Sequence, residues 1–317
     1  MKTIQRVAII GECMVELSKP PQPEGETATP NCSLSQGFGG DTLNTAIYLS
    51  RMTQSAGLET CYITGLGVDP FSRQMLEAWR EEGIDTQGVY QLADRVPGMY
   101  AIETDESGER QFYYWRNESA ARFWLEAIDT ETVMNTLSSC QLIYLSGISL
   151  AILPEDSRAR LMTFLAECRD QGAVIAFDNN YRPRLWEAPE VAQHWYQNML
   201  ALTDIAFLTF EDEQLLWEDE TEQQAIQRTL ESGVGEIVIK RGAQACWIVY
   251  DGQQIEVAAQ KVANVVDTTA AGDSFSAGYL AKRVLGESPT EAGHSGHQLA
   301  ATVIQHRGAI IPKTAMP

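Results

Sequence analysis

Short apolar runs rich in β-branched residues alternate with longer amphipathic stretches along most of this chain. This alternation is typical of βαβ units, in which helices join parallel strands. It predicts an α/β fold with a mostly parallel central sheet flanked by helices. The predicted strands cover residues 7–10, 60–64, 142–146, 174–178, 205–208, 237–240 and 246–250. The predicted helices cover residues 41–52, 71–82, 130–137, 155–171, 211–217, 222–231, 272–284 and 290–306.

Two stretches interrupt the alternation. Residues 14–38 are rich in Pro, Glu, Thr and Ser, and residues 88–116 show strand-like alternation with turn signals such as Pro97-Gly98. We expect both stretches to leave the main sheet together. An ordinary antiparallel hairpin at the edge of the sheet is the alternative interpretation.

Length and charge limit the classes of function. A chain of 317 residues can form one large α/β domain with a small accessory part. A net charge of −20 without clustered Lys and Arg argues against a nucleic-acid partner. We expect a cytoplasmic protein with no membrane partner, because we find neither a leader nor an apolar run near the roughly 20 residues that span a bilayer. The six scattered cysteines contain no Cys-x-x-Cys pair, so we expect no disulfide or cysteine metal site.

A run of small residues near the carboxyl terminus predicts a phosphate site. Residues 267–278 read Asp-Thr-Thr-Ala-Ala-Gly-Asp-Ser-Phe-Ser-Ala-Gly, follow an apolar strand and open a helix. Small residues let several backbone N–H groups converge on an anion at a helix N-terminus. Asp273 is placed to take a proton from an attacking hydroxyl. Simple helix capping is the competing interpretation.

A second glycine motif lies near the amino terminus. Residues 37–44 read Gly-Phe-Gly-Gly-Asp-Thr-Leu-Asn and also precede a helical pattern. Two such sites in one chain predict two ligands.

Together the two motifs resemble the signatures of the ribokinase-like (PfkB-type) carbohydrate kinases. Residues 39–44 match the amino-terminal signature and residues 267–273 the carboxy-terminal one, in the expected order. The resemblance runs from Val7 to Pro312 and includes residues 65–69 and 240–242. It implies a ribokinase-like fold with a small β-sheet lid over the sugar.

The resemblance also implies a division of the chain and a partner. Residues 1–13, 39–87 and 117–317 would form the nucleotide-binding α/β core, and residues 14–38 and 88–116 the substrate lid. Because the lids of two subunits commonly pair in this family, we expect a homodimer through the lid, with higher oligomers left open.

On the phosphate side, the resemblance implies ATP and Mg²⁺ as cofactors and leaves open a monovalent cation. Asp273 would be the base, and the backbone of Ala270, Ala271 and Gly272 would form the anion hole. Many members have Gly at the first of these positions, and we expect a negative φ at Ala270 because a methyl group disfavours a positive one. The nucleotide residues would be Asn180, Lys240, Arg241 and Gly242, together with Ala270 and Gly272.

The metal site departs from the family pattern. The family's Asn-x-x-Glu motif aligns with Thr209-Phe210-Glu211-Asp212, which differs at both ends. Glu211 or Asp212 could still order Mg²⁺, and we assign no direct metal ligand.

On the sugar side, we expect Gly40, Asp41 and Asn44 to contact the substrate. Alternation on a lid strand puts Tyr114 and Arg116 on one face, alongside Tyr100 from the partner strand. Residues 178–186 resemble a segment shared by fructokinases and 2-keto-3-deoxygluconate kinases, and Arg182 in this segment can approach the sugar. We leave Glu12 and Glu16 out of the site, because acidic residues would repel a carboxylate substrate.

Two arginines facing one pocket favour a substrate with a carboxylate, since a guanidinium can bind one bidentately. We therefore expect phosphorylation of the terminal hydroxyl of a sugar acid, 2-keto-3-deoxy-D-gluconate. A fructokinase or ribokinase-like enzyme of a neutral sugar is the nearest alternative. A sugar-binding regulator without turnover is a further one, which the intact Asp273 and Gly272 disfavour.

Overall fold

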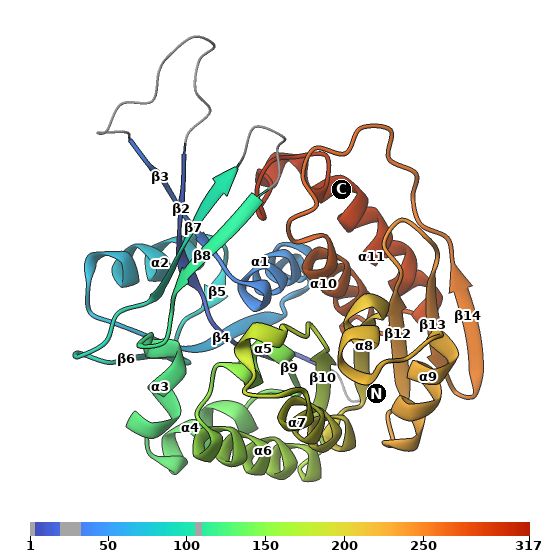
Figure 1. Cartoon of the computed structure of the whole chain (residues 1–317), viewed down its shortest axis with the longest axis horizontal. Helices are drawn as coiled ribbons and strands as arrows, with labels where there is room; N and C mark the ends of the chain where they lie inside the picture. Colours follow the sequence, from blue (N-terminus) through green and yellow to red (C-terminus); the bar gives the residue numbers. More distant parts are fainter. Residues whose placement is uncertain (1–3, 20–32, 105–109) are drawn as a thin grey trace.

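The computed structural model describes residues 4–19, 33–104 and 110–317. Within these ranges a large sheet carries helices on both faces, and a small sheet stands apart from it (Figure 1). The predicted α/β class, with a mostly parallel sheet and a separate small sheet, is confirmed. None of the described helices combines the length and the apolar character needed to cross a membrane.

The large sheet has ten strands in the order β14-β13-β12-β11-β10-β9-β1-β4-β5, with β6 also paired to β4. All neighbours from β12 to β5 run parallel, while β13 and β14 add antiparallel edge strands. The strands are β1 (Arg6–Ile10), β4 (Glu59–Leu66), β5 (Ile84–Asp85), β6 (Val89–Gln91), β9 (Leu142–Ser146), β10 (Val174–Asp178), β11 (Ile205–Thr209), β12 (Glu236–Lys240), β13 (Cys246–Tyr250) and β14 (Gln253–Val257).

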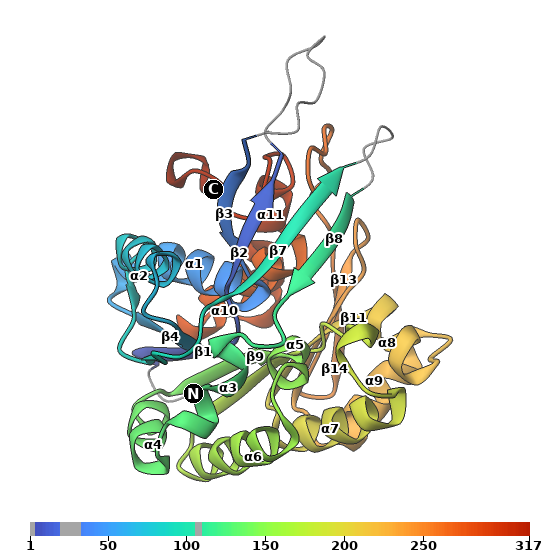
Figure 2. The same ribbon diagram turned by 60° about the vertical axis from the view of Figure 1, so that its left-hand side comes forward.

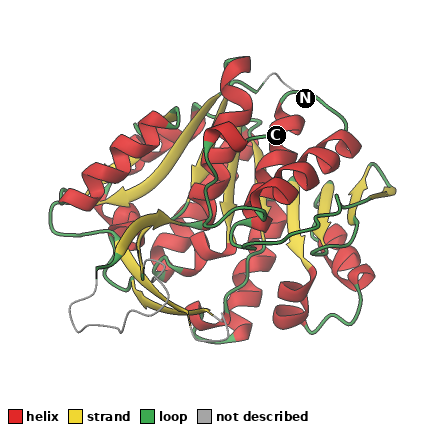
Figure 3. Ribbon diagram, turned by 90° about the horizontal axis from the view of Figure 1, so that it is seen from above, coloured by secondary structure: helices red, strands yellow, loops and turns green. Residues whose placement is uncertain are grey.

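Helices cover both faces of this sheet, as the view from above shows (Figure 3). They are α1 (Asp41–Thr53), α2 (Pro70–Glu81), α3 (Ala120–Ala127), α4 (Thr130–Ser138), α5 (Gly147–Ala151), α6 (Glu155–Asp170), α7 (Pro189–Leu202), α8 (Phe210–Trp217), α9 (Glu222–Glu231), α10 (Ala271–Val284) and α11 (Pro289–Val303). Successive strand residues point to opposite faces, so Ile10 packs in one apolar cluster and Ile9 in the other. The sheet is therefore buried on both sides, as parallel sheets usually are.

The small sheet contains four strands in the order β3-β2-β7-β8. They are β2 (Met14–Ser18), β3 (Ser35–Gly39), β7 (Gly98–Thr104) and β8 (Arg110–Trp115). Strand β2 lies between antiparallel β3 and parallel β7, which joins the two interrupting stretches in one sheet. Figure 2 shows this sheet projecting away from the core. Since β6 pairs with β4 of the large sheet, we propose that the lid begins after Gln91.

Three α-helices and the two strands at the ends of the large-sheet order, the two-residue β5 and β14, were not predicted. Helices α3, α5 and α7 were missed, although Ala192, Trp195, Tyr196 and Met199 of α7 are buried at helical spacing. Aromatic and polar residues crowd this segment and obscure its period. Strand β14 was missed because its sequence, Gln-Gln-Ile-Glu-Val, is mostly polar, and an edge strand with one solvated face needs few apolar residues.

Candidate active site at the carboxyl ends of the strands

Two cavities adjoin where the central parallel strands end. The first, here called the lid cavity, has a volume of about 490 Å³ and lies between the small sheet and the starts of α1 and α10. The second, here called the helix cavity, has a volume of about 640 Å³ and reaches α11. Both cavities share a wall formed by Thr209, Lys240, Thr268, Ala271 and Gly272. Ligands of open α/β sheets usually bind at this end of the strands.

Asp273 lies in the first turn of α10 and faces the lid cavity. Asn44 of α1 donates a hydrogen bond of 2.8 Å from Nδ2 to Oδ2 of Asp273. Burial, reinforced by the negative charge of Asp41, raises the pKa of Asp273 to about 7, although the Asn44 hydrogen bond opposes the shift. A carboxyl group with this pKa can exchange a proton at neutral pH.

The turn before Asp273 corrects one expectation. Ala270 has φ +61°, in the left-handed region, and not the negative φ that its methyl group favours. This conformation costs about 1–2 kcal/mol for a residue other than glycine. The segment just before Ala270 is anchored by Asp267, which accepts a hydrogen bond from the backbone N–H of Thr269 and another from that of Gly308.

The predicted anion-hole residues lie in the shared wall or beside it. Ala270 lines the lid cavity, whereas Ala271 and Gly272 line both cavities. The Ala271 N–H is engaged in a turn, since it donates to the carbonyl of Thr268 at 3.2 Å. An anion would therefore compete with this turn for one of the three predicted backbone donors.

Lys240 ends strand β12 and reaches the point where the cavities meet. Its Nζ lies 2.7 Å from Oδ2 of Asp178, which also accepts a hydrogen bond from Ser276. A Cβ at Gly272 would lie 3.5 Å from the same Nζ. The cation thus stands directly in front of the N-terminus of α10, where a phosphate would meet both.

Asn180 and Asp41 form another contact between distant segments. Nδ2 of Asn180 donates to Oδ2 of Asp41 at 2.6 Å, and Asn180 has φ +30°. Both side chains line the lid cavity, as does Gly40. Asn180, expected near the nucleotide, therefore lines the lid cavity and not the helix cavity.

The lid supplies an aromatic wall. Tyr100 of β7 pairs in register with Tyr114 of β8, and their ring centroids are 5.8 Å apart. The Tyr100 hydroxyl donates to Glu16, while a Cβ at Gly39 would lie only 2.2 Å from that hydroxyl oxygen. Glycine at position 39 therefore allows Tyr100 to occupy the wall.

Glu12, which the sequence argument left out of the site, lines the lid cavity, whereas Glu16 lines neither cavity and accepts the hydrogen bond from Tyr100. Glu12 is buried in the lid cavity, where its Oε2 accepts from Arg116 and its Oε1 from the Ser119 hydroxyl at 2.6 Å. We expected Glu12 to repel a substrate carboxylate. The Arg116 cation compensates the charge of Glu12, so that expectation does not apply. The position of Glu12 just after β1, at the carboxyl end of a central strand, was the available signal.

Arg182 lines the same cavity as Arg116, as predicted. Its Nη1 lies 3.2 Å from Oδ1 of Asp212, and the side chain is 51% exposed. Asp212 faces the lid cavity, whereas Glu211 faces the helix cavity. The two candidates for ordering a metal are thus separated by the shared wall.

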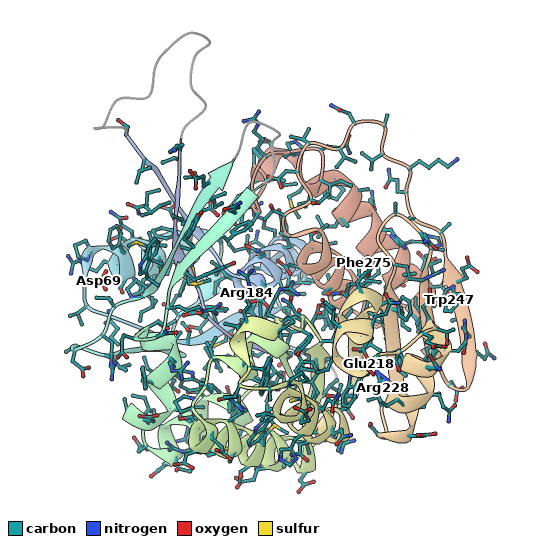
Figure 4. All side chains as sticks on the ribbon, viewed as in Figure 1. Asp69, Arg184, Glu218, Arg228, Trp247 and Phe275 are labelled. Carbon is teal, nitrogen blue, oxygen red and sulfur yellow. The ribbon has the colours of Figure 1, made fainter. Side chains whose placement is uncertain are left out.

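The helix cavity receives the other predicted nucleotide residues. Arg241 and Gly242 line it, yet Nε of Arg241 donates to Glu222 at 2.8 Å and its guanidinium lies 4.3 Å from the Trp247 ring. Figure 4 labels this tryptophan on β13. Both cations are thus paired with a carboxylate, but only Lys240 lines both cavities and lies beside the start of α10, so it is the better placed cation for a phosphate.

An apolar wall that the sequence analysis did not identify closes the helix cavity. Its members come from α10, α11 and the residue that follows α11, and they are Phe275, His297, Ala300, Ala301 and Ile304. The rings of Phe275 and His297 meet edge to face, with centroids 5.0 Å apart (Phe275 is labelled in Figure 4). His297, Ala300, Ala301 and Ile304 follow one another at helical spacing, and this pattern was the available signal for a common face.

Across the described ranges, no three His, Cys, Asp or Glu side chains gather into a metal-binding group. The residues present still fit Mg²⁺, because this ion is usually bound through only one or two carboxylates together with substrate phosphates and water. Glu211 offers one such carboxylate in the helix cavity, beside Thr209 and Lys240.

The chain is similar to several known proteins. A family model described as pfkB family carbohydrate kinase matches residues 4–316. The 2-dehydro-3-deoxygluconokinase of Dickeya dadantii strain 3937 is 52% identical, with 99% of each chain covered. The enzyme of the same name from Escherichia coli K12 is 50% identical over the same shares. A putative ribokinase II from E. coli, solved in complex with ATP and Mg²⁺, has a TM-score of 0.81 at 25% identity and covers 96% of this chain and 94% of its own.

Proposed function

The chain belongs to the pfkB family of carbohydrate kinases, and from this premise we propose that it phosphorylates the terminal hydroxyl of 2-keto-3-deoxy-D-gluconate with Mg·ATP. The products are the 6-phosphate of the sugar acid and ADP. The two relatives with about half of their residues identical to this chain are named for the same substrate, also called 2-dehydro-3-deoxygluconate. ATP and Mg²⁺ are carried over from the family and from the ribokinase II complex.

One observation carries the choice of a sugar acid. Within the described ranges, Nε of Arg116 and Oδ1 of Asn44 are buried and have no hydrogen-bond partner. Both residues line the lid cavity. A buried donor and acceptor without partners cost free energy, which a ligand can recover. A carboxylate would accept from the guanidinium, and a sugar hydroxyl would donate to the amide.

The ion pairs of both arginines are compatible with this proposal. Arg116 is bound to Glu12 and Arg182 to Asp212. A guanidinium has five N–H donors, so it can hold a protein carboxylate and a substrate carboxylate together. The protein carboxylates also fix the orientation of each fork before the substrate arrives.

The phosphoryl transfer itself follows from positioning. Asp273 accepts the proton of the terminal hydroxyl, and Asn44 keeps the carboxylate oriented. The N-terminus of α10, chiefly the Gly272 N–H, and the Lys240 ammonium stabilise the charge on the transferred group. Mg²⁺, when bound with ATP, neutralises phosphate charge, and Glu211 is the residue we place beside it.

A coupled ADP-release assay tests the proposal with Mg·ATP and 2-keto-3-deoxygluconate, fructose, ribose and adenosine in parallel. We expect strong preference for the sugar acid. Preference for a neutral sugar would keep the kinase mechanism and remove the carboxylate role of Arg116. Inactivity with all four compounds would support a sugar-binding regulator.

The outer face of the lid supports a homodimer. Strand alternation directs Tyr114 toward the lid cavity, whereas Tyr113 and Trp115 point away from it and are 45% and 62% exposed. We expect these aromatic side chains to be buried against a second lid. Light scattering should report a dimer for the native protein and a monomer for Trp115→Glu, and an unchanged mass would contradict this interface.

A further inference from the structure

Asn179 is a fully buried residue between two residues of the candidate site. It follows β10 and lies between Asp178, which holds Lys240, and Asn180, which contacts Asp41. Its side chain is 0% exposed and lines neither cavity. It therefore acts only through its neighbours.

The amide of Asn179 is fully hydrogen bonded. Oδ1 accepts from the backbone N–H of Asn180 at 2.7 Å and from that of Thr209 at 3.0 Å. Nδ2 donates to the Thr209 carbonyl at 3.1 Å and to Oε1 of Glu213 at 2.7 Å. The side chain thus joins the ends of β10 and β11 beyond the last paired residues of these strands, Asp178 and Phe207.

Asn180 needs such support. Its φ of +30° is unusual for a residue other than glycine. Strained backbone at a functional site persists only where the surroundings hold it in place. The hydrogen bond from the Asn180 N–H to the side chain of Asn179 fixes the residue that reaches Asp41.

Glu213 extends this arrangement toward the surface. It is 2% exposed, and its Oε2 accepts from Arg228 of α9, which also pairs with Asp219 at 2.7 Å. Burial raises the pKa of Glu213, and the positive charge of Arg228 opposes this effect. Figure 4 labels Arg228 on the α8 and α9 side of the molecule. A continuous chain of contacts therefore runs from Arg228 through Glu213 and Asn179 to the cavity wall.

We propose that Asn179, oriented by Glu213, is a positioning residue for phosphoryl transfer, because it sets the backbone of Asn180 in the lid cavity and of Thr209 in the wall that both cavities share. This inference rests on the proposed kinase function. It is distinct from a purely structural role, in which Asn179 would only link two strands.

The test replaces the hydrogen-bond donor of the Asn179 amide with an acceptor and then restores a donor at position 213. In Asn179→Asp, one carboxylate oxygen still accepts from both backbone N–H groups, but the other faces the Glu213 carboxylate and the Thr209 carbonyl. We expect kcat per folded enzyme to fall at least about tenfold, the scale of a small misplacement in an active site. Adding Glu213→Gln places an amide donor opposite the new carboxylate, and the double variant should recover most of the lost kcat.

Glu236→Gln is the matched control. Glu236 is also buried and paired with an arginine, Arg283, at 2.8 Å, but it lies at the opposite end of β12 from Lys240. This variant should lower the melting temperature and keep kcat. If Asn179→Asp does not fold, Glu213→Gln alone should still lower kcat severalfold.

The outcomes separate this inference from the proposed function. An unchanged kcat in folded Asn179→Asp, or in Glu213→Gln if the first variant is unfolded, overturns the inference while the native enzyme is active. A kcat in the double variant no higher than in Asn179→Asp also overturns it. Inactivity of the native protein with every sugar rejects the proposed function itself.

Discussion

Asn44 and Asp273 are 229 positions apart in the sequence, and a hydrogen bond of 2.8 Å joins their side chains. Each belongs to one of the two glycine motifs, so this bond connects the motifs directly. It also places the proposed base at the start of one helix against the first turn of another. Substitutions of the residues around this hydrogen bond can therefore test the proposed site.

Replacement of the base should separate chemistry from binding. We expect Asp273→Asn to lower kcat by about 10²–10⁴-fold, the usual contribution of a positioned general base. The amide is nearly the same size, so ADP and the sugar acid should still bind, as measured by calorimetry. Substantial turnover in this variant would remove Asp273 as the base.

The rate should depend on pH through the same carboxyl group. Only ionised Asp273 can accept a proton, and its pKa is raised to about 7. We therefore expect kcat/KM for the sugar acid to rise as the pH increases through about 7 and then to level off. A profile that is flat between about pH 5.5 and 8 would contradict this assignment.

Stability should show the opposite dependence. Between pH 3.8 and about 7 the folded protein keeps Asp273 protonated while the unfolded chain ionises it. The folded state then binds more protons, so this group lowers the free energy of unfolding as the pH rises through that interval. Asp273→Asn should therefore melt a few degrees above the native protein at pH 8, with the difference reduced toward zero near pH 4. Equal melting temperatures at pH 8 would show that the carboxyl group is not destabilised by its surroundings.

The pair formed by Arg116 and Glu12 gives a test of substrate class. Arg116→Ala should raise KM for the sugar acid by about tenfold or more and leave KM for ATP nearly unchanged, because a charged hydrogen bond is typically worth about 1.5–3 kcal/mol. The single variant also leaves Glu12 buried without its cation, which is destabilising.

Arg116→Ala combined with Glu12→Gln removes that second effect. The double variant should melt above Arg116→Ala but keep its high KM for the sugar acid. A KM restored to the native value in the double variant would mean that Arg116 only compensates Glu12. Steady-state kinetics on the folded fraction, with both substrates varied, distinguishes these results.

Much of the fold was predictable because its signals are local. The strands at 142–146, 174–178 and 246–250 have the predicted bounds, since an apolar run between polar flanks has to be buried. The helix at 189–202 was missed, because its aromatic side chains pack against residues of other segments that only the fold brings close to it. Trp195, for example, lies 5.2 Å from the Arg158 guanidinium of α6.

The sequence alone determined the order of most elements, the two glycine motifs and the residue types of the proposed phosphate site. These properties depend on the order and spacing of residues along the chain, which can be read directly from the sequence. Only the tertiary structure decided the positive φ of Ala270, the pairing of Glu12 with Arg116 and the burial of Asn179 between two strands. Each of these depends on which distant groups share a buried volume, where charges and hydrogen-bonding groups need partners.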